Sequence, residues 1–235
     1  MNKINCQNCR NEFQIEQADL NFYQKIKVPS PTWCPECRMK RRMAFRNERR
    51  LFRQVDFLTG NKILSVLPLE SGQRVIDDKS WWGQKGWDPM EYGMDFDENR
   101  PFFEQLLELC KKVPKPALSA SGMINSDYSG NAEDFRNCYL CFNGSFNEDC
   151  AYANGINNSK NCYEASHIAK CERCYDSILI NNCYDTHFSV QCDDCVSVWF
   201  SKRCRGCTNC FGCVNLVNQS YCFYNEQLSK EEYEQ

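Results

Sequence analysis

The stretch that decides the fold is Asn161-Cys-Tyr-Glu-Ala-Ser-His-Ile-Ala-Lys-Cys-Glu-Arg-Cys-Tyr-Asp176, within a segment from Ala120 to Cys222. Fourteen of the 19 cysteines lie between Cys138 and Cys222, and successive ones are separated by one, three or four triplets. They therefore share one phase of a three-residue period. The 35 positions of this phase from Ala120 to Cys222 include no charged residue. We interpret this phase as the buried one, because charged side chains are rarely fully buried.

A longer period is superimposed on the first. Cys141, Cys162, Cys183 and Cys204 recur at a constant interval of seven triplets. A fixed period of this size is typical of repeat architectures, and the many Asn, Asp, Ser and Gly residues favour sharp corners. We predict a parallel β-solenoid over residues 118–225 with coils of about 21 residues and a bend in nearly every triplet. A bundle of polyproline-II-like segments and a string of zinc knuckles are the alternatives.

The N-terminus carries a metal-ligand pattern. Cys6-Gln-Asn-Cys9 is followed by Cys34-Pro-Glu-Cys37. Two CxxC pairs supply four thiolates for a tetrahedral Zn²⁺, as in closed structural sites. Positions 1–37 include few apolar side chains, and so small a unit rarely folds without a metal or a disulfide. We predict that Cys6, Cys9, Cys34 and Cys37 bind Zn²⁺.

The second CxxC pair leads directly into a basic segment that ends at Arg53. This segment lacks Pro and Gly, so we predict a helix over 38–53. Two zinc knuckles followed by a helix resemble a treble-clef zinc finger, which would occupy residues 1–53. A cationic helix face suits phosphate contacts and predicts binding to RNA, DNA or an acidic protein. The residues of this predicted interface are Arg38, Lys40, Arg41, Arg42, Arg46, Arg49, Arg50 and Arg53.

Residues 54–117 form a predicted linker module with a β-hairpin, a tryptophan cluster and a helix. The strand–turn–strand pattern loosely resembles a zinc ribbon without ligands, with Val55 and Asp77 or Asp78 at the knuckle positions. The helix is predicted to begin after an Asn99 N-cap and to end at Val113-Pro114, and its apolar face, from Phe102 to Cys110, is expected to cap the first coil. Residues 226–235 begin a C-terminal helix.

Composition bears on the compartment. The net charge is −3, and neither an apolar run long enough to span a membrane nor an N-terminal signal peptide is evident. We therefore expect a cytoplasmic protein with reduced cysteines and no membrane partner. Three roles remain open for the solenoid cysteines. They are small core residues, stacked disulfides, or soft-metal ligands, with one such set being Cys171, Cys174, Cys192 and Cys195.

Several segments together resemble a family of cysteine-rich bacterial zinc-binding proteins, with a treble-clef-like zinc finger followed by a cysteine-ladder repeat. The resemblance covers nearly the whole chain and implies zinc, but no activity. The segments that carry it are Phe22-Tyr-Gln-Lys-Ile-Lys-Val-Pro29, Cys34-Pro-Glu-Cys-Arg-Met-Lys-Arg-Arg42, Phe45-Arg-Asn-Glu-Arg49, Asp88-Pro-Met-Glu-Tyr-Gly93, Arg100-Pro-Phe-Phe-Glu-Gln105, the Asn-Cys-Tyr repeats and Leu228-Ser-Lys-Glu-Glu-Tyr233.

These patterns favour a mainly β protein without enzymatic activity. We find no Gly-rich phosphate loop, no Ser/His/Asp set and no HExxH helix, and no small-molecule substrate is evident. The expected function is a zinc-stabilised binding or scaffold protein whose basic helix contacts nucleic acid or an acidic protein. The alternative is a thiolate-rich metal-storage or metal-buffering protein that uses the solenoid cysteines.

Overall fold

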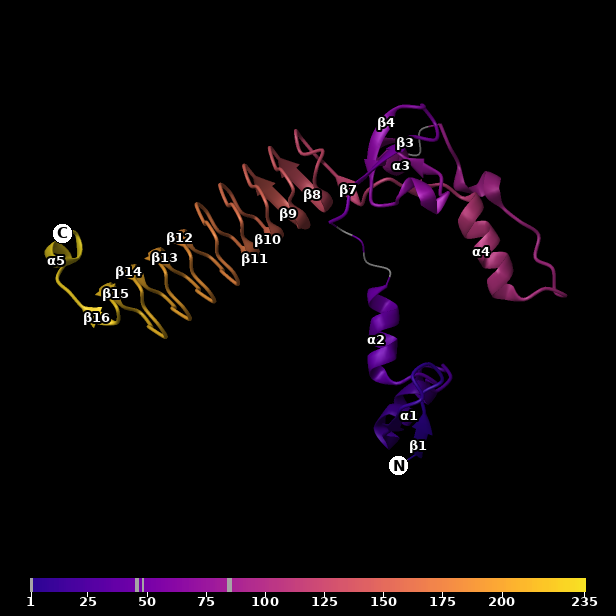
Figure 1. Cartoon of the computed structure of the whole chain (residues 1–235), viewed down its shortest axis with the longest axis horizontal. Helices are drawn as coiled ribbons and strands as arrows, with labels where there is room; N and C mark the ends of the chain where they lie inside the picture. Colours follow the sequence, from indigo (N-terminus) through magenta and orange to yellow (C-terminus); the bar gives the residue numbers. More distant parts are fainter. Residues whose placement is uncertain (1, 45–46, 48, 84–85) are drawn as a thin grey trace. The chain divides into compact units, whose positions relative to one another are not determined.

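The computed structural model describes residues 2–44, 47, 49–83 and 86–235 (Figure 1). The chain is mainly β, with short helices and a parallel β-solenoid, as the sequence predicted. It divides into two compact units, Met1–Asn47 and Glu48–Gln235, which are described separately below. No helix in the described part of the chain combines the length and apolar character needed to cross a bilayer.

The N-terminal unit is a small β-hairpin followed by two helices. Strands β1 (Asn2–Asn5) and β2 (Glu12–Ile15) pair antiparallel, and Cys6 and Cys9 lie in the turn between them. Helix α1 (Gln17–Lys25) lies in the connection that leads to the second CxxC pair. Helix α2 (Pro35–Met43) begins at that pair, with Cys34 as its N-cap and a proline at its first position.

The prediction of one helix over 38–53 was wrong. Helix α2 ends at Met43, and Phe52–Val55 forms strand β3, which pairs with β4 (Lys62–Ser65). Helix propensity differs by only a few tenths of a kcal/mol between most residues, so tertiary context readily overrides it. Here a hairpin turn fixes the conformation that follows Phe52. Of the predicted interface, Arg46 lies outside the described residues.

The second unit opens with a module of short elements, residues 52–116. Within it, β5 (Val75–Ile76) pairs parallel with β6 (Lys115–Pro116), which precedes the solenoid. The elements after β4 are η1 (Leu69–Ser71), β5 (Val75–Ile76), α3 (Asp78–Gly83), η2 (Pro89–Tyr92), α4 (Phe102–Lys112) and β6 (Lys115–Pro116). Trp81 stacks on Trp87 with ring centroids 4.4 Å apart, so part of the tryptophan cluster is a packing contact.

Residues 52–83 repeat the backbone scheme of the N-terminal unit without its cysteines. The amide of Asp56 bonds to the Asn61 carbonyl at 2.8 Å, as the amide of Cys6 bonds to Asn11 at 2.9 Å. The Asp77 amide donates to Oδ1 of Asp56 at 3.0 Å. The Cys34 amide donates in the same way to Sγ of Cys6 at 3.2 Å.

The positions that match the four cysteines are Asp56, Thr59, Asp77 and Ser80, with Asp56 where the sequence comparison placed Val55. Asp56 is 1% exposed and accepts hydrogen bonds from both the amide and the hydroxyl of Thr59. Burial alone would raise the pKa of this carboxyl, but these hydrogen bonds lower it. The Asp56 carboxylate thus accepts hydrogen bonds from nearby amides, as the sulfur of Cys6 does in the N-terminal unit.

The remainder of the chain is a solenoid whose coils contain four triplets, not the predicted seven. Bridges join each residue to its counterpart four triplets later, as in Val196↔Thr208. Four triplets place one triplet on each side of the coil. The longer sequence period therefore spans one and three-quarter coils, and cysteines that share it lie on different sides.

The strands of the solenoid form two stacks along its length (Figure 1). All pairings within the coils are parallel, and only the terminal β15–β16 pair is antiparallel. The strands are β7 (Ala120–Ser121), β8 (Gly130–Arg136), β9 (Phe142–Glu148), β10 (Asn154–Asn157), β11 (Ser166–Ala169), β12 (Tyr184–His187), β13 (Val196–Trp199), β14 (Thr208–Phe211), β15 (Ser220–Phe223) and β16 (Glu226–Gln227).

The predicted bend in each triplet is a residue with positive φ directly before the inward residue. Asn137, Leu140 and Asn143 have φ of 53°, 51° and 60°, and the pattern continues through most of the solenoid. Asn and Asp tolerate this left-handed conformation better than other non-glycine residues, which explains their abundance. Their side chains also form ladders between coils, as where Nδ2 of Asn182 donates to Asp194 at 2.7 Å. A period of three is thus compatible with stacked strands.

Many inward residues are serine or cysteine because they bond with backbone amides and carbonyls that are buried in the core. The amide of Ser201 donates to Oγ of Ser189, one coil earlier, at 3.1 Å. The amide of Cys195 donates to Sγ of Cys183 at 3.3 Å. The same side chains donate to carbonyls, as in the 2.8 Å bond from Ser189 Oγ to the oxygen of His187. A serine or cysteine therefore satisfies buried backbone groups that alanine leaves unpaired.

One outer side of the solenoid carries a column of aromatic rings. Trp199 follows His187 by one coil, with ring centroids 4.5 Å apart. In the neighbouring column Phe188 stacks on Phe200 at 4.6 Å. These contacts run along the coil axis and add to the stability of the stack.

The two ends of the solenoid are covered by different elements. The inward residues of the first coil face β4 and α3 across a cavity, and no α4 residue lines it. Phe103 and Leu107 of α4 are 79% and 54% exposed, so the prediction that this helix caps the first coil was wrong. At the other end, α5 (Lys230–Tyr233) opens with a capping box of Ser229 and Glu232, and Tyr233 packs on Tyr221.

Candidate metal centre

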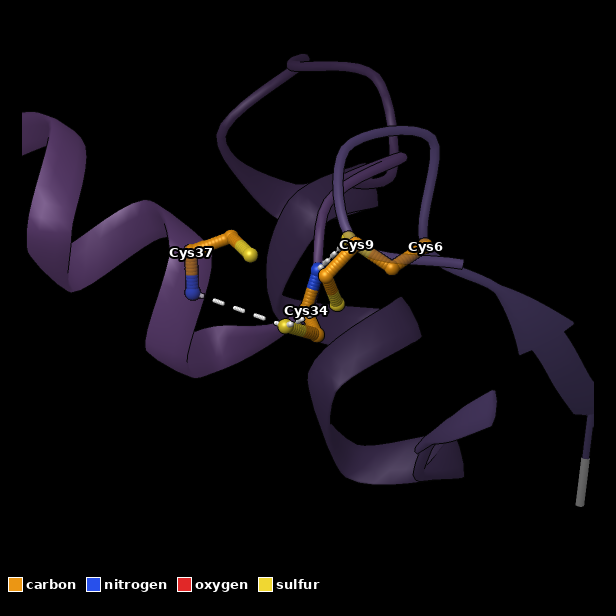
Figure 2. A group of neighbouring side chains, drawn as sticks. All are labelled: Cys6, Cys9, Cys34 and Cys37. Carbon is orange, nitrogen blue, oxygen red and sulfur yellow. Dashed lines mark hydrogen bonds between the residues drawn. The ribbon is translucent and has the colours of Figure 1, made fainter. Parts of the chain in front are cut away.

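The four predicted cysteine ligands lie together in the N-terminal unit. Cys6 and Cys9 come from the hairpin turn, and Cys34 and Cys37 from the start of α2 (Figure 2). Their sulfur atoms all lie within 4.8 Å of one another. A tetrahedral site with Zn–S bonds of about 2.3 Å has sulfur–sulfur edges of about 3.8 Å. The sulfurs of Cys9 and Cys34 are 3.8 Å apart, so the donor set fits a tetrahedral thiophilic metal.

Hydrogen-bond donors surround the sulfurs and orient them. The amide of Cys34 donates to Sγ of Cys6 at 3.2 Å, and the amide of Cys37 donates to Sγ of Cys34 at 3.5 Å (Figure 2). Nδ2 of Asn8 donates to Sγ of Cys37 at 3.3 Å. Such donors stabilise thiolate charge and fix ligand orientation in metal sites. Asn8 was not among the predicted site residues, although its place inside the first CxxC pair is the signal that points to it.

The four thiols are not equivalent without a cation. Burial raises the pKa of Cys6, but the amides of Cys9, Cys34 and Asn8 outweigh it and lower that pKa to about 6. The amide of Asn11 lowers the pKa of Cys9, but burial and the neighbouring thiols outweigh it and raise that pKa to about 11. Thiolates this close repel one another, so a bound cation is needed to ionise all four. The chemistry of the site is therefore that of a metal-binding cluster.

Four of the predicted nucleic-acid contacts lie on α2, and three of these four have contacts of their own. Nζ of Lys40 forms an ion pair with Glu36 at 2.9 Å, one helical turn away. Arg41 lies over the Trp33 ring, 5.3 Å from its centroid. Arg38 donates to the Tyr23 hydroxyl at 3.5 Å and is only partly exposed, whereas Arg42 is exposed. The exposed cationic surface of this helix therefore centres on Lys40, Arg41 and Arg42.

The other described members of the predicted interface belong to the second unit. Nε of Arg49 donates to Oδ1 of Asn154 on the solenoid at 3.3 Å. Arg50 lies over the Phe52 ring at 5.4 Å, and Arg53 is part of β3. Since α2 ends at Met43, these three arginines do not continue its cationic face.

The solenoid cysteines are core residues. All fourteen are buried, and they belong to one continuous cluster. Among the residues that the structure describes, the N-terminal cysteines are the sole group of three or more potential ligands close enough to hold a metal. Cys171, Cys174, Cys192 and Cys195 are therefore not brought together as a four-thiolate site. Burial also raises the pKa of Cys210 to about 12, which keeps that thiol protonated.

Neither protein-family models nor curated proteins match this chain.

Proposed function

We propose that the chain is a non-enzymatic binding protein whose N-terminal unit is a zinc-stabilised treble clef that contacts nucleic acid. Zinc is the metal that four-thiolate structural sites most commonly hold. Its bonds would tie the β1–β2 turn to the first turn of α2, and so hold the cationic residues of the helix in place. The solenoid acts as a rigid scaffold.

The observation that carries the proposal is the segregation of charge between the two units. Residues 1–47 contain nine basic and four acidic residues, a net charge of +5. The whole chain has 28 basic and 31 acidic residues, which leaves 19 and 27, a net charge of −8, for the second unit. Four thiolates with one Zn²⁺ contribute about −2, so the first unit stays cationic. A basic surface on an otherwise acidic chain favours a polyanionic partner.

The solenoid cysteines give little support to a metal-storage function, because they are buried and their thiols bond to backbone groups. Storage would require the metal to displace these hydrogen bonds. The N-terminal cluster alone gives a capacity of one ion, which suits a structural role.

The test is binding of the full chain to fluorescent single-stranded RNA and duplex DNA at about 50 mM and about 200 mM salt. Four phosphate contacts would weaken binding to duplex DNA roughly 10²-fold between these concentrations, because bound counterions are released. The double variant Arg41→Gln/Arg42→Gln should bind more weakly and show a shallower salt dependence. Arg205→Gln, on the solenoid, is the matched control.

Three outcomes would overturn the proposal. Binding that does not depend on salt would exclude phosphate contacts. Equal affinity of the double variant and the control would exclude α2 as the interface. Failure to bind either nucleic acid, together with capture of an acidic peptide by the same arginines, would replace nucleic acid with an acidic protein as the partner.

A further inference from the structure

The first coil of the solenoid leaves an open cavity at its mouth, entirely within the second unit. Its volume is about 560 Å³, within the range of small-molecule pockets. Its floor is the four inward residues of the first coil, and its opposite wall is formed by β4 and α3. The floor residues are Ala120, Met123, Ser126 and Ser129.

The apolar part of the cavity is unusual for the end of a repeat. A solenoid normally buries its terminal core under a cap. Here Ile63 and Leu64 of β4 and Met123 of the first coil are only half-buried and line the space. The hydroxyls of Ser126 and Ser129 already accept the amides of the second coil, as in the 2.9 Å bond from Cys138 to Ser126. They stabilise the floor and leave its surface mainly apolar.

Two neighbouring carboxyl groups, Asp77 and Asp78, reach the cavity from the start of α3, and both are half-buried. Oδ1 of Asp78 accepts the amide of Leu118 at 2.9 Å. Burial, together with the charge of Asp77, raises the pKa of Asp78 to about 7 against the opposing effect of this hydrogen bond. A cation beside the carboxylate would relieve this cost of burial.

The charged side chains that line the cavity are unevenly distributed. Arg53, Lys62 and Lys79 line it and are exposed, as are Asp127 and the aromatic rings of Trp82 and Tyr128. Negative charge is therefore concentrated in the half-buried part, and positive charge in the exposed part. The half-buried carboxylates therefore favour a cation in the inner part of the cavity.

From this geometry we propose that the cavity binds a small molecule with an apolar body and an ammonium group, and that the ammonium pairs with Asp78. The apolar body contacts Ile63, Leu64 and Met123. The outer end of the ligand is neutral or anionic, since it lies near the three basic side chains. This site is independent of the N-terminal metal cluster.

The probes are 2-phenylethylamine, its neutral isostere 2-phenylethanol and the anion 3-phenylpropionate, titrated into the full chain by calorimetry. We expect the amine to bind most tightly, and more tightly at about pH 8 than at about pH 6, because Asp78 ionises between them. Asp78→Asn, which keeps an acceptor for Leu118, should weaken amine binding roughly tenfold or more. Asp176→Asn, on the outer face of the solenoid, is the matched control.

A second variant leaves Asp78 unchanged and tests the cavity even if Asp78→Asn fails to fold. Met123→Trp fills the cavity from its floor, and it should abolish binding of the amine while the far-UV circular dichroism spectrum is retained. Equal binding of amine and alcohol, tighter binding of the anion, unchanged affinity in either variant, or no saturable binding of the amine at millimolar concentration would each overturn the proposal.

Discussion

Replacement of Ser189 by alanine tests how the solenoid core is held together. Ser189 is 0% exposed, and its hydroxyl both accepts from the amide of Ser201 at 3.1 Å and donates to the carbonyl of His187 at 2.8 Å. The variant Ser189→Ala leaves the Ser201 amide without this partner in a core that excludes water. A buried unsatisfied donor costs about 1–3 kcal/mol. We therefore expect the free energy of unfolding to fall by about 2 kcal/mol.

The assay is urea denaturation followed by far-UV circular dichroism. If the free energy of unfolding falls by about 2 kcal/mol per molar urea, the midpoint of the unfolding curve should fall by about 1 M. Ser189→Cys should stay within about 0.5 kcal/mol of the parent, because a cysteine sulfur makes the same contact between Cys183 and Cys195 at 3.3 Å. Ser166→Ala, at a partly exposed position of β11, controls for loss of a hydroxyl.

Amide hydrogen exchange gives a local measurement of the same effect. Protection of the Ser201 amide should drop in Ser189→Ala and persist in Ser189→Cys. A stabilising role for the hydrogen bonds of the inward serines is refuted if Ser189→Ala and Ser166→Ala destabilise the protein equally. It is also refuted if cysteine at this position is as harmful as alanine, since the hydrogen-bonding capacity would then be irrelevant.

Three further predictions concern the metal site and the module beside it. Cys37→Ser should lower the metal content from about one ion per chain to near zero and unfold the N-terminal unit, measured by elemental mass spectrometry and by proteolysis; full retention of metal would contradict the assignment. Asp78 has a pKa of about 7 in the folded state and about 4 when unfolded, so the folded chain holds an extra proton between these values. The free energy of unfolding should therefore fall as pH rises from about 4 to about 7, and Asp78→Asn should flatten this dependence; identical pH profiles for the two proteins would exclude the effect. A four-cysteine variant of the 52–83 module should bind a second metal ion, because its backbone already matches the N-terminal site, and an unchanged stoichiometry would refute that match; the substitutions are Asp56→Cys, Thr59→Cys, Asp77→Cys and Ser80→Cys.

The sequence by itself determined the features that depend on local chemistry and on phase. The uncharged phase of the triplets identified the interior of the solenoid, because charged side chains cannot be buried unpaired. The spacing of Cys6, Cys9, Cys34 and Cys37 identified the candidate metal ligands, because CxxC turns place two sulfurs side by side. The C-terminal helix predicted within residues 226–235 likewise depends on a local signal, since Ser229 and Glu232 form a capping box across three residues.

Only the tertiary structure decided which residues stack. The four-triplet coil follows from left-handed bends in the backbone, and the longer sequence period concealed it, because similar residues recur after seven triplets while a coil closes after four. Strand β3 begins at Phe52, inside the segment predicted as a helix, because it pairs with β4 in a hairpin that Asp56 organises. The cavity beside Asp78 brings together β4, α3 and the first coil, which are distant in sequence, so no local pattern could reveal it.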